Sequence, residues 1–203
     1  MSDNVFRFLA VVIFIIGAAI SGYFRRKADR EGGKVSLADE GVIITIALRV
    51  FGLALWASVF AWMINPAWMS WSRFDLPDWA RWLGVVLGIG ADALSYWVFS
   101  HLANNVSPTV VAREQAQLVT SGPYRYVRHP LYTMGTIAYL GFALVAENWW
   151  IAVLSVLVFA VLAVRTPKEE ARLIAKFGDQ YREYMKTTGR FLGFPRVEHR
   201  LRS

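Results

Sequence analysis

Long apolar segments, separated by charged linkers, constrain this chain more than any other feature of its sequence. A helix that spans a bilayer needs about 20 mainly apolar residues, and the segments that approach or reach this length are Val5–Phe24, Gly41–Ile64, Trp82–Leu102, Leu131–Ala146 and Trp149–Val164. The last two are separated only by Glu147 and Asn148, which allows no more than a tight hairpin. The sequence therefore predicts an all-α, polytopic membrane protein with about five transmembrane helices.

The composition excludes several other classes of protein. Of the 203 residues, 56% are hydrophobic and 18% are charged, whereas soluble domains average about 45–50% and about 25%. The net charge of +7 alone would fit a nucleic-acid-binding protein, but the mean hydropathy of +0.37 favours a membrane over nucleic acid as the partner. The chain has no cysteine and its three histidines lack metal-ligand spacing, so we expect neither disulfides nor a metal site.

Positive charge is distributed unevenly between the linkers. The segments 25–40 and 103–130 carry five and three Lys or Arg residues, and the chain from Arg165 onward carries ten, against five acidic residues. The linker at 65–81 has two arginines and two aspartates, and the hairpin tip has no basic residue. By the positive-inside rule, we expect the N-terminus outside and the C-terminal region in the cytoplasm.

Two charged residues fall inside predicted spans. Arg49 lies nine residues from Glu40, at the inner edge of the second span, and Asp92 lies ten residues from Leu102, at the inner edge of the third. At about 1.5 Å per residue, their depths are nearly equal. Because intramembrane charges are usually paired, we expect a structural contact between Arg49 and Asp92.

The segment Gly122–Tyr132 (GPYRYVRHPLY) is unlike the rest of the chain, since it places three tyrosines, two arginines and a histidine just before a span. Gly-Pro at its start predicts a turn, and Pro130 suits the first turn of a helix. The midpoint between Arg128 and Arg165 falls on the hairpin turn. Two helices of equal length therefore bring both arginines to the same depth at the cytoplasmic face.

The sequence after Arg165 predicts the start of another helix. Thr166, Pro167 and Glu169 have the pattern of a capping box with proline at the first helical position. The apolar stripe of this cytoplasmic amphipathic helix is Leu173, Ile174, Phe177, Tyr181 and Tyr184. Glu170 is not needed for the cap.

These predictions place a polar cluster at the inner membrane edge, made of Arg128, His129, Tyr132, Arg165, Glu169 and Glu170. It offers cations for an anionic group and carboxylates for hydroxyls or an ammonium, which suits a polar, zwitterionic cofactor beside a lipid-soluble substrate. No glycine-rich phosphate loop or dinucleotide fingerprint is present. An interpretation of the arginines and tyrosines as interfacial anchors explains each residue type singly but not their clustering.

Three spaced motifs resemble the isoprenylcysteine carboxyl methyltransferase family, a group of integral membrane methyltransferases that includes relatives of phospholipid N-methyltransferases. They are Gly122–Tyr132, Arg165-x-x-x-Glu169-Glu170, and Phe177-Gly178-x-x-Tyr181-x-x-Tyr184 with Gly189-Arg190-Phe191. We therefore expect a single membrane-embedded domain over 1–203, with N-terminal spans at 1–101, a cofactor-binding and catalytic region at 102–192 and a basic tail at 193–203.

The resemblance implies an enzyme that uses S-adenosyl-L-methionine. By position it implicates, as cofactor-binding residues, Gln117, Leu118, Val119, Tyr124, His129, Pro130, Leu131, Tyr132 and Glu169, to which the polar cluster adds Glu170. Arg128 and Arg165 correspond to a catalytic, substrate-positioning pair. The expected partner is a lipophilic or lipidated acceptor that enters from the bilayer, with the site facing the cytoplasm from a bacterial-type inner membrane or an endomembrane.

Four interpretations of the function remain. In the preferred interpretation, the enzyme methylates a carboxylate of an isoprenylcysteine-like or other lipid, because this reaction depends on the orientation of the two reactants more than on acid–base catalysis. A phospholipid amine would need a base, for which Glu170 is the candidate. An NADPH-dependent sterol reductase shares a His-Pro-x-Tyr element, but that group typically has Asn where Leu131 stands. The fourth is a non-catalytic membrane protein.

Overall fold

The computed structural model describes residues 3–32, 42–102 and 118–193. Its elements are α1 (Asp3–Gly32), α2 (Val42–Ile64), the 3-10 helix η1 (Pro66–Ser72), α3 (Asp78–Leu102), the 3-10 turn η3 (Gly122–Arg125), α4 (Pro130–Val145), α5 (Trp149–Phe177) and α6 (Asp179–Thr187). Within these ranges the only β-structure is two isolated bridges. The predicted all-α class is confirmed.

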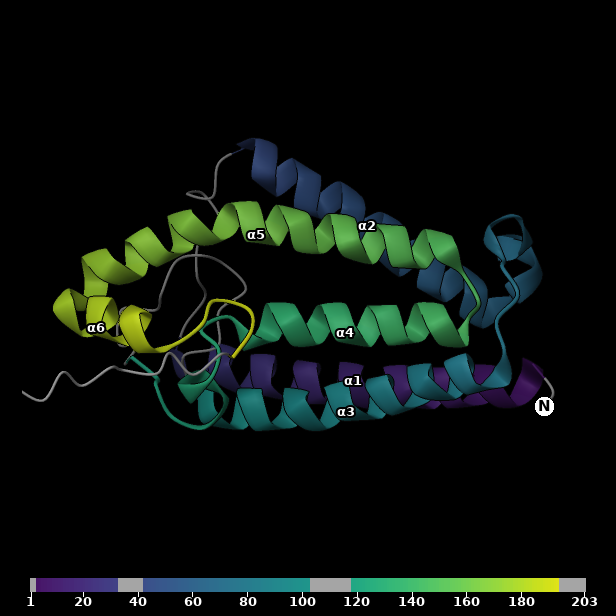
Figure 1. The fold of residues 1–203 in the computed structure, drawn as a ribbon, viewed down its shortest axis with the longest axis horizontal. Coiled ribbons are helices and arrows are strands. Elements are labelled where there is room, and N and C mark those ends of the chain that lie inside the picture. Colours follow the sequence, from purple (N-terminus) through teal and green to yellow (C-terminus); the bar gives the residue numbers. More distant parts are fainter. Residues whose placement is uncertain (1–2, 33–41, 103–117, 194–203) are drawn as a thin grey trace, which may run out of the picture.

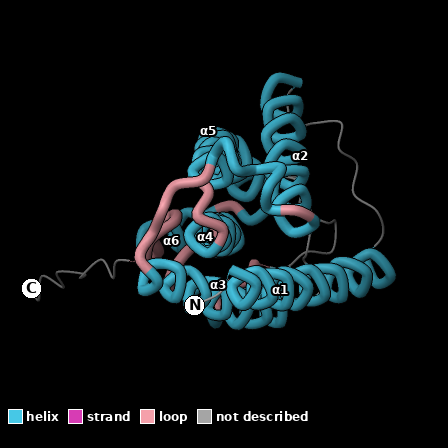
Figure 2. Tube along the Cα trace, turned by 90° about the vertical axis from the view of Figure 1, so that its right-hand side faces the viewer, coloured by secondary structure: helices cyan, strands magenta, loops and turns pink. Residues whose placement is uncertain are grey.

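Helix α4 occupies the centre of the bundle. Figure 1 shows it between α5 on one side and the pair α1 and α3 on the other, and the view in Figure 2 shows the same order. Helix α2 packs against α5 and η1, and its N-terminal end stands away from the other helices. Helix α6 lies beyond the N-terminal end of α4, where α5 ends.

Four helices are long and apolar enough to span a membrane, namely α1 over Asp3–Lys27, α2, α3 and α5. Their outer faces expose large apolar side chains such as Ile43 (84% exposed), Leu53 and Val86, as a lipid-facing surface requires. Helix α4 corresponds to the fourth predicted span but has only 16 residues, which rise about 24 Å against a hydrocarbon core of about 30 Å. The polytopic membrane class is confirmed, with four long helices around one short helix, while the orientation stays a prediction.

Paired glycines bring α3 and α4 into backbone contact. A Cβ on Gly84 would lie 2.5 Å from the carbonyl oxygen of Gly141, and a Cβ on Gly141 would lie 2.9 Å from that of Gly84. Real Cβ atoms do not approach other atoms this closely, so both positions require glycine at this helix separation.

The predicted start of a helix at Pro167 is wrong. Helix α5 continues through Pro167 to Phe177, and Thr166 Oγ1 donates to the carbonyl of Leu162 (2.8 Å) in the preceding turn. A proline inside a helix removes one backbone hydrogen bond, a loss that a long helix packed against neighbours tolerates. The interruption comes later, at Gly178, whose φ of +59° favours glycine.

The predicted contact between Arg49 and Asp92 is also wrong. Arg49 is exposed on α2, whereas the Asp92 carboxyl lies against α1, where a Cβ on Gly17 would be 2.5 Å from Asp92 Oδ1. Helix α3 packs against α1 and α4, while α2 packs against α5. Arg49 and Asp92 were predicted at the same depth, but they lie on helices that do not pack against each other through these faces.

The end of the bundle opposite α6 is held by the buried Arg81. Its guanidinium donates to Asp3 Oδ1 (2.7 Å) and to the Val145 carbonyl (3.2 Å), and Nη1 lies 3.6 Å from Glu147 Oε2. These contacts tie the start of α1, the start of α3 and the α4–α5 hairpin together.

Candidate active site

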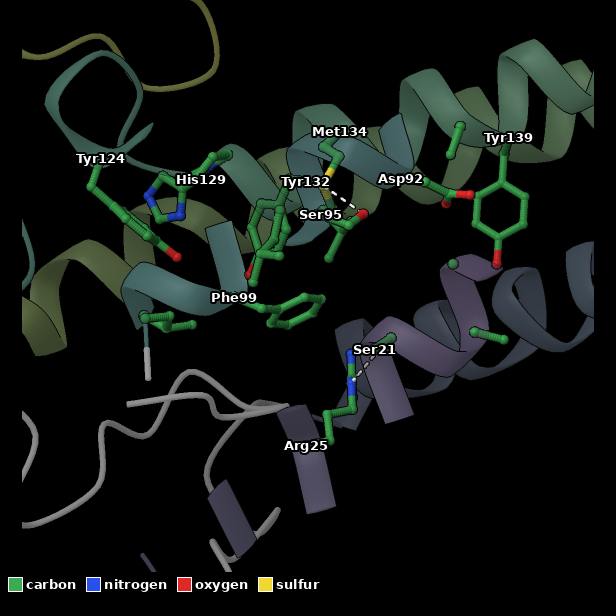
Figure 3. Close-up of a pocket in the computed structure, with 18 of the residues that line it drawn as sticks. Ser21, Arg25, Asp92, Ser95, Phe99, Tyr124, His129, Tyr132, Met134 and Tyr139 are labelled. Carbon is green, nitrogen blue, oxygen red and sulfur yellow. Dashed lines mark hydrogen bonds between the residues drawn. The ribbon is translucent and has the colours of Figure 1, made fainter. Parts of the chain in front are cut away.

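A cavity of about 900 Å³ runs between α1, α3 and α4 and reaches the C-terminal half of α5 and the helix α6. Figure 3 shows a section of it, with Tyr124 and His129 at one end and Tyr139 at the other. Near α6 its lining is polar and aromatic. Farther from α6 the lining is mainly apolar and includes Ile13, Phe142 and Val145. One continuous cavity therefore joins a polar end, near α6, to an apolar part. This apolar part, lined by residues such as Ile13, Phe142 and Val145, is called the apolar lane below.

Ten of the twelve residues that the sequence analysis assigned to the site line this cavity: Leu118, Val119, Tyr124, Arg128, His129, Pro130, Leu131, Tyr132, Arg165 and Glu169. They come from the segment before α4, from the first turn of α4 and from the C-terminal half of α5. Gln117 lies outside the described residues, and Glu170 is buried but is not part of the cavity lining.

The first turn of α4 presents an imidazole and a phenol to the polar end of the cavity. The rings of His129 and Tyr132 are stacked, with centroids 5.4 Å apart and planes inclined by 16°. The Tyr132 hydroxyl donates to Glu169 Oε2 at 2.6 Å, and His129 Nδ1 lies 3.9 Å from the same oxygen. Glu169 thus belongs to this wall and does not cap a helix.

Two consecutive glutamates of α5 have different environments. Arg165 and Glu169 lie one turn apart, so they share the face of α5 that borders the cavity. Glu170 is rotated by about 100° from Glu169 around the helix and points into the protein. There it accepts from Arg128 Nε (3.0 Å) and Arg190 Nη2 (2.6 Å), with His129 Nε2 at 3.3 Å.

The residues after α6 form a C-terminal strap, defined here as 188–193, across the start of α4. The backbone amides of Arg128 and His129 donate to the carbonyls of Gly189 (2.8 Å) and Arg190 (3.0 Å), and Thr133 Oγ1 donates to the Phe191 carbonyl (2.8 Å). The Gly-Arg-Phe motif was noted in the sequence without a role. Its role is to cover His129 and to supply a second arginine to Glu170, which is the part of the site that sequence reasoning missed.

Three buried tyrosines complete the polar end. Tyr184 donates from its hydroxyl to the Tyr124 carbonyl, and Tyr181 has a buried hydroxyl without a hydrogen-bond partner among the described residues. Burial raises the pKa of Tyr124, Tyr181 and Tyr184 above the ordinary value for a phenol. All three therefore remain neutral hydroxyls at physiological pH.

In the described ranges, no three His, Asp or Glu side chains come together in a way that could hold a metal ion. The chemical groups at the polar end are cations, carboxylates, an imidazole and neutral phenols. Such a set can bind and orient a charged or zwitterionic organic ligand by hydrogen bonds and ion pairs.

Comparison with known proteins identifies the family. The family described as phospholipid methyltransferase matches residues 79–180, half of the chain. The chain belongs to the phospholipid methyltransferase family, and this membership supports the resemblance drawn from the motifs. The matched residues include nearly all of α3, the whole of α4 and α5, and the start of α6, which contain most of the cavity's polar end.

Curated relatives and a solved structure agree with this membership. The chain is 27% identical over 149 residues (71% of this chain, 64% of the relative) to the cobalt-zinc-cadmium resistance protein CzcN of Cupriavidus metallidurans. It is 40% identical over 70 residues (34% of this chain, 30% of the relative) to the protein-S-isoprenylcysteine O-methyltransferase of Schizosaccharomyces pombe. The eukaryotic intramembrane Ras methyltransferase, isoprenylcysteine carboxyl methyltransferase, has a similar fold over 92% of this chain and 68% of that one (TM-score 0.51, 17% identity).

Proposed function

We propose that this integral membrane protein is a methyltransferase that uses S-adenosyl-L-methionine and methylates a carboxylate of a lipid-soluble acceptor. The observation that carries the proposal is the continuity of the cavity, because a single space holds a polar end for a charged cofactor and an apolar lane for a lipid tail. Family membership and the partial similarity to an isoprenylcysteine O-methyltransferase support the same activity. They also favour it over an NADPH-dependent reductase.

The residues at the polar end fit S-adenosyl-L-methionine by their chemistry. Glu169 offers carboxylate oxygens for an ammonium or for ribose hydroxyls, and the buried Tyr181 hydroxyl lacks a partner among the described residues. His129 and Tyr132 provide further donors on the same wall. When bound, this cofactor supplies a methyl group activated by a positively charged sulfur.

We assign the orientation of the acceptor to Arg165. Its guanidinium is buried, borders the cavity and lies on the same face of α5 as Glu169. A cation at this place holds an anionic headgroup beside the cofactor, and two held reactants gain a large effective concentration. The apolar walls exclude water from the acceptor and strengthen the ion pair.

We assign a positioning role to Arg128 and Glu170. Arg128 lines the cavity, but its guanidinium donates to Glu170 and to the carbonyls of Met185 and Thr188. Glu170 in turn is bound by two arginines. Because this carboxylate is enclosed by cations and lies outside the cavity lining, it is poorly placed as the base that an amine acceptor would need, which favours a carboxylate acceptor.

The decisive experiment supplies purified protein in lipid nanodiscs with methyl-labelled S-adenosyl-L-methionine and a total lipid extract. We expect a labelled lipid whose label is released by mild alkali, since methyl esters hydrolyse and N-methylamines do not. An alkali-stable labelled lipid would shift the proposal to amine methylation. No transfer together with no binding of S-adenosylhomocysteine would overturn it.

We further propose that the polar end faces the cytoplasm, which follows from the excess of basic residues in the segments beside it. A cofactor made in the cytoplasm would then reach the site directly, while the acceptor would enter from the bilayer.

A further inference from the structure

The apolar lane of the cavity contains a carboxyl group that the proposed reaction does not use. Asp92 lies in the middle of α3 and lines the cavity. Figure 3 shows His129, Tyr132 and Asp92 in this order along the cavity, with Asp92 in the same section as Tyr139. A carboxyl group is an unusual lining for a lane built to hold a hydrocarbon tail.

The distance of Asp92 from the polar end follows from the register of α3 and α4. Ser95 Oγ lies 3.0 Å from Met134 Sδ, so these two residues are level. Asp92 precedes Ser95 by three residues on α3, and Tyr132 precedes Met134 by two on α4, which runs in the opposite direction. Five residues of helical rise therefore place Asp92 about 8 Å farther into the lane than Tyr132.

No residue in the described part of the chain supplies a partner to this carboxyl. Asp92 has no hydrogen bond and no ion pair with any described residue. The nearby Ser95 hydroxyl is directed to the Ala91 carbonyl (2.8 Å) and to Met134. Arg25, which also lines the cavity, donates to Ser21 and lies two helical turns, about 12 Å, from Gly17, against which Asp92 packs.

A polar group inside a membrane costs free energy unless something binds it. Asp92 faces a space that a ligand is expected to fill, and Tyr139 adds a phenol to the same section. Together they offer acceptor oxygens and a hydroxyl donor in one section of the cavity. Such a pair recognises a group that donates hydrogen bonds.

We propose that Asp92, with Tyr139, forms a second polar subsite, about 8 Å farther into the lane than Tyr132, that selects acceptors carrying a hydroxyl or an amino group partway along the chain. The inference rests on the proposed function, since it assumes that the acceptor's tail occupies the lane. It adds a specificity determinant within the membrane-embedded part of the site.

Binding of three probes tests the subsite without requiring turnover. They are hexadecanoic acid and its two derivatives with a hydroxyl or an amino group at mid-chain, and their Kd values are measured in nanodiscs in the presence of S-adenosylhomocysteine. We expect the native chain to bind at least one substituted acid about tenfold more tightly than the plain acid, the gain of one good hydrogen bond to a charged group. Comparison of the Kd values of the hydroxyl and amino derivatives identifies which hydrogen-bond donor the subsite prefers.

Variants connect the preference to Asp92. In Asp92→Leu we expect the preference to vanish while hexadecanoic acid binds as well as before or better, and in Asp92→Asn we expect an amino preference to fall more than a hydroxyl preference. Arg49→Leu, which changes the other charged residue predicted at this depth but lies outside the cavity, is the control and should keep the preference. Unaltered binding of S-adenosylhomocysteine verifies that each variant is folded.

Two results would overturn the subsite, namely equal affinity of the native chain for all three acids, or the same preference in Asp92→Leu. Methyl transfer without such a preference would refute the subsite and leave the proposed function standing. A native chain that neither binds S-adenosylhomocysteine nor transfers methyl would refute the proposed function itself.

Discussion

Arg128 Nε donates to Glu170 Oε1 at 3.0 Å, and the same guanidinium donates to the carbonyls of Met185 and Thr188. This relationship joins residues that are 42 positions apart in the chain and links the start of α4 to α5, α6 and the C-terminal strap. The cavity's polar end therefore depends on an ion pair in which Arg128 lines the cavity and Glu170 lies behind the lining.

Removal of the Glu170 carboxylate should destabilise the protein. Glu170→Ala leaves the buried Arg128 without its counter-ion, a loss of about 3–5 kcal/mol for an ion pair of this kind. The measurement is denaturant-induced unfolding in detergent micelles. Glu183→Ala is the matched control, because this carboxylate is exposed and, among the described residues, pairs with Lys186. Its removal should change the free energy of unfolding by less than about 1 kcal/mol. Equal effects would contradict a special role for Glu170.

Arg165→Ala should abolish methyl transfer while S-adenosylhomocysteine still binds, because we place this cation on the acceptor. Arg165→Lys should recover part of the rate, since lysine keeps the charge but loses the planar two-point geometry. Transfer of labelled methyl and calorimetric binding are measured on the same preparation. The control is Arg182→Ala on the outer face of α6, where the arginine pairs with Asp179 at the surface. Parallel loss of binding and transfer in Arg165→Ala would reject this assignment.

Tyr132→Phe and Glu169→Gln should each weaken binding of S-adenosylhomocysteine, and the double variant should lose less than the sum. The reason is the 2.6 Å hydrogen bond between the two side chains, because removal of either partner disrupts the same contact. A coupling of about 1 kcal/mol is expected for directly bonded residues. Titration calorimetry of the native protein and the three variants gives this coupling, and strict additivity would show that the two residues act separately.

Gly84→Ala should destabilise the bundle, since the new Cβ would meet the Gly141 carbonyl oxygen at 2.5 Å. The cost should be in the range of about 1–3 kcal/mol that overpacking produces. Gly90→Ala on the same helix has no atom within 4 Å of the added Cβ and should be neutral or slightly stabilising. Thermal unfolding in one detergent compares the two, and similar Tm values would contradict the close approach of α3 and α4.

The absence of cysteine from the chain makes its orientation easy to measure. Thr187→Cys lies at the end of α6, and Ser70→Cys lies in η1 at the opposite end of the bundle; both side chains are exposed. We expect a membrane-impermeant maleimide to label Ser70→Cys in intact cells and Thr187→Cys only after permeabilisation. The reverse pattern would refute the predicted cytoplasmic site.

Hydropathy and simple symmetry predicted much of this structure. The apolar segments marked the five helices to within a few residues at most ends, and the hairpin midpoint brought Arg128 and Arg165 to one cavity. Both inferences depend on the length and polarity of single segments, which a membrane makes strongly informative.

The wrong predictions concern features that are determined by tertiary packing and not by the local sequence. The capping pattern at Thr166 and Pro167 did not start a new helix, because α5 continues through it and packs against α2, α4 and α6. Equal depth of Arg49 and Asp92 did not reveal that α3 faces α1 and α4 and not α2. The partnership of Glu170 with Arg190 joins residues whose proximity depends on the course of the chain after α6.

The shortness of α4 has a consequence for the membrane around the protein. The helix rises about 6 Å less than the hydrocarbon thickness, and its first turn carries His129 and Tyr132. We therefore expect the boundary between water and hydrocarbon to dip into the bundle at this point. A charged headgroup would then stay hydrated almost until it reaches Arg165, the residue proposed to orient it, and a tail in the lane would stay within the acyl-chain region. The protein would thus bring two immiscible phases into contact at the depth where the proposed transfer takes place.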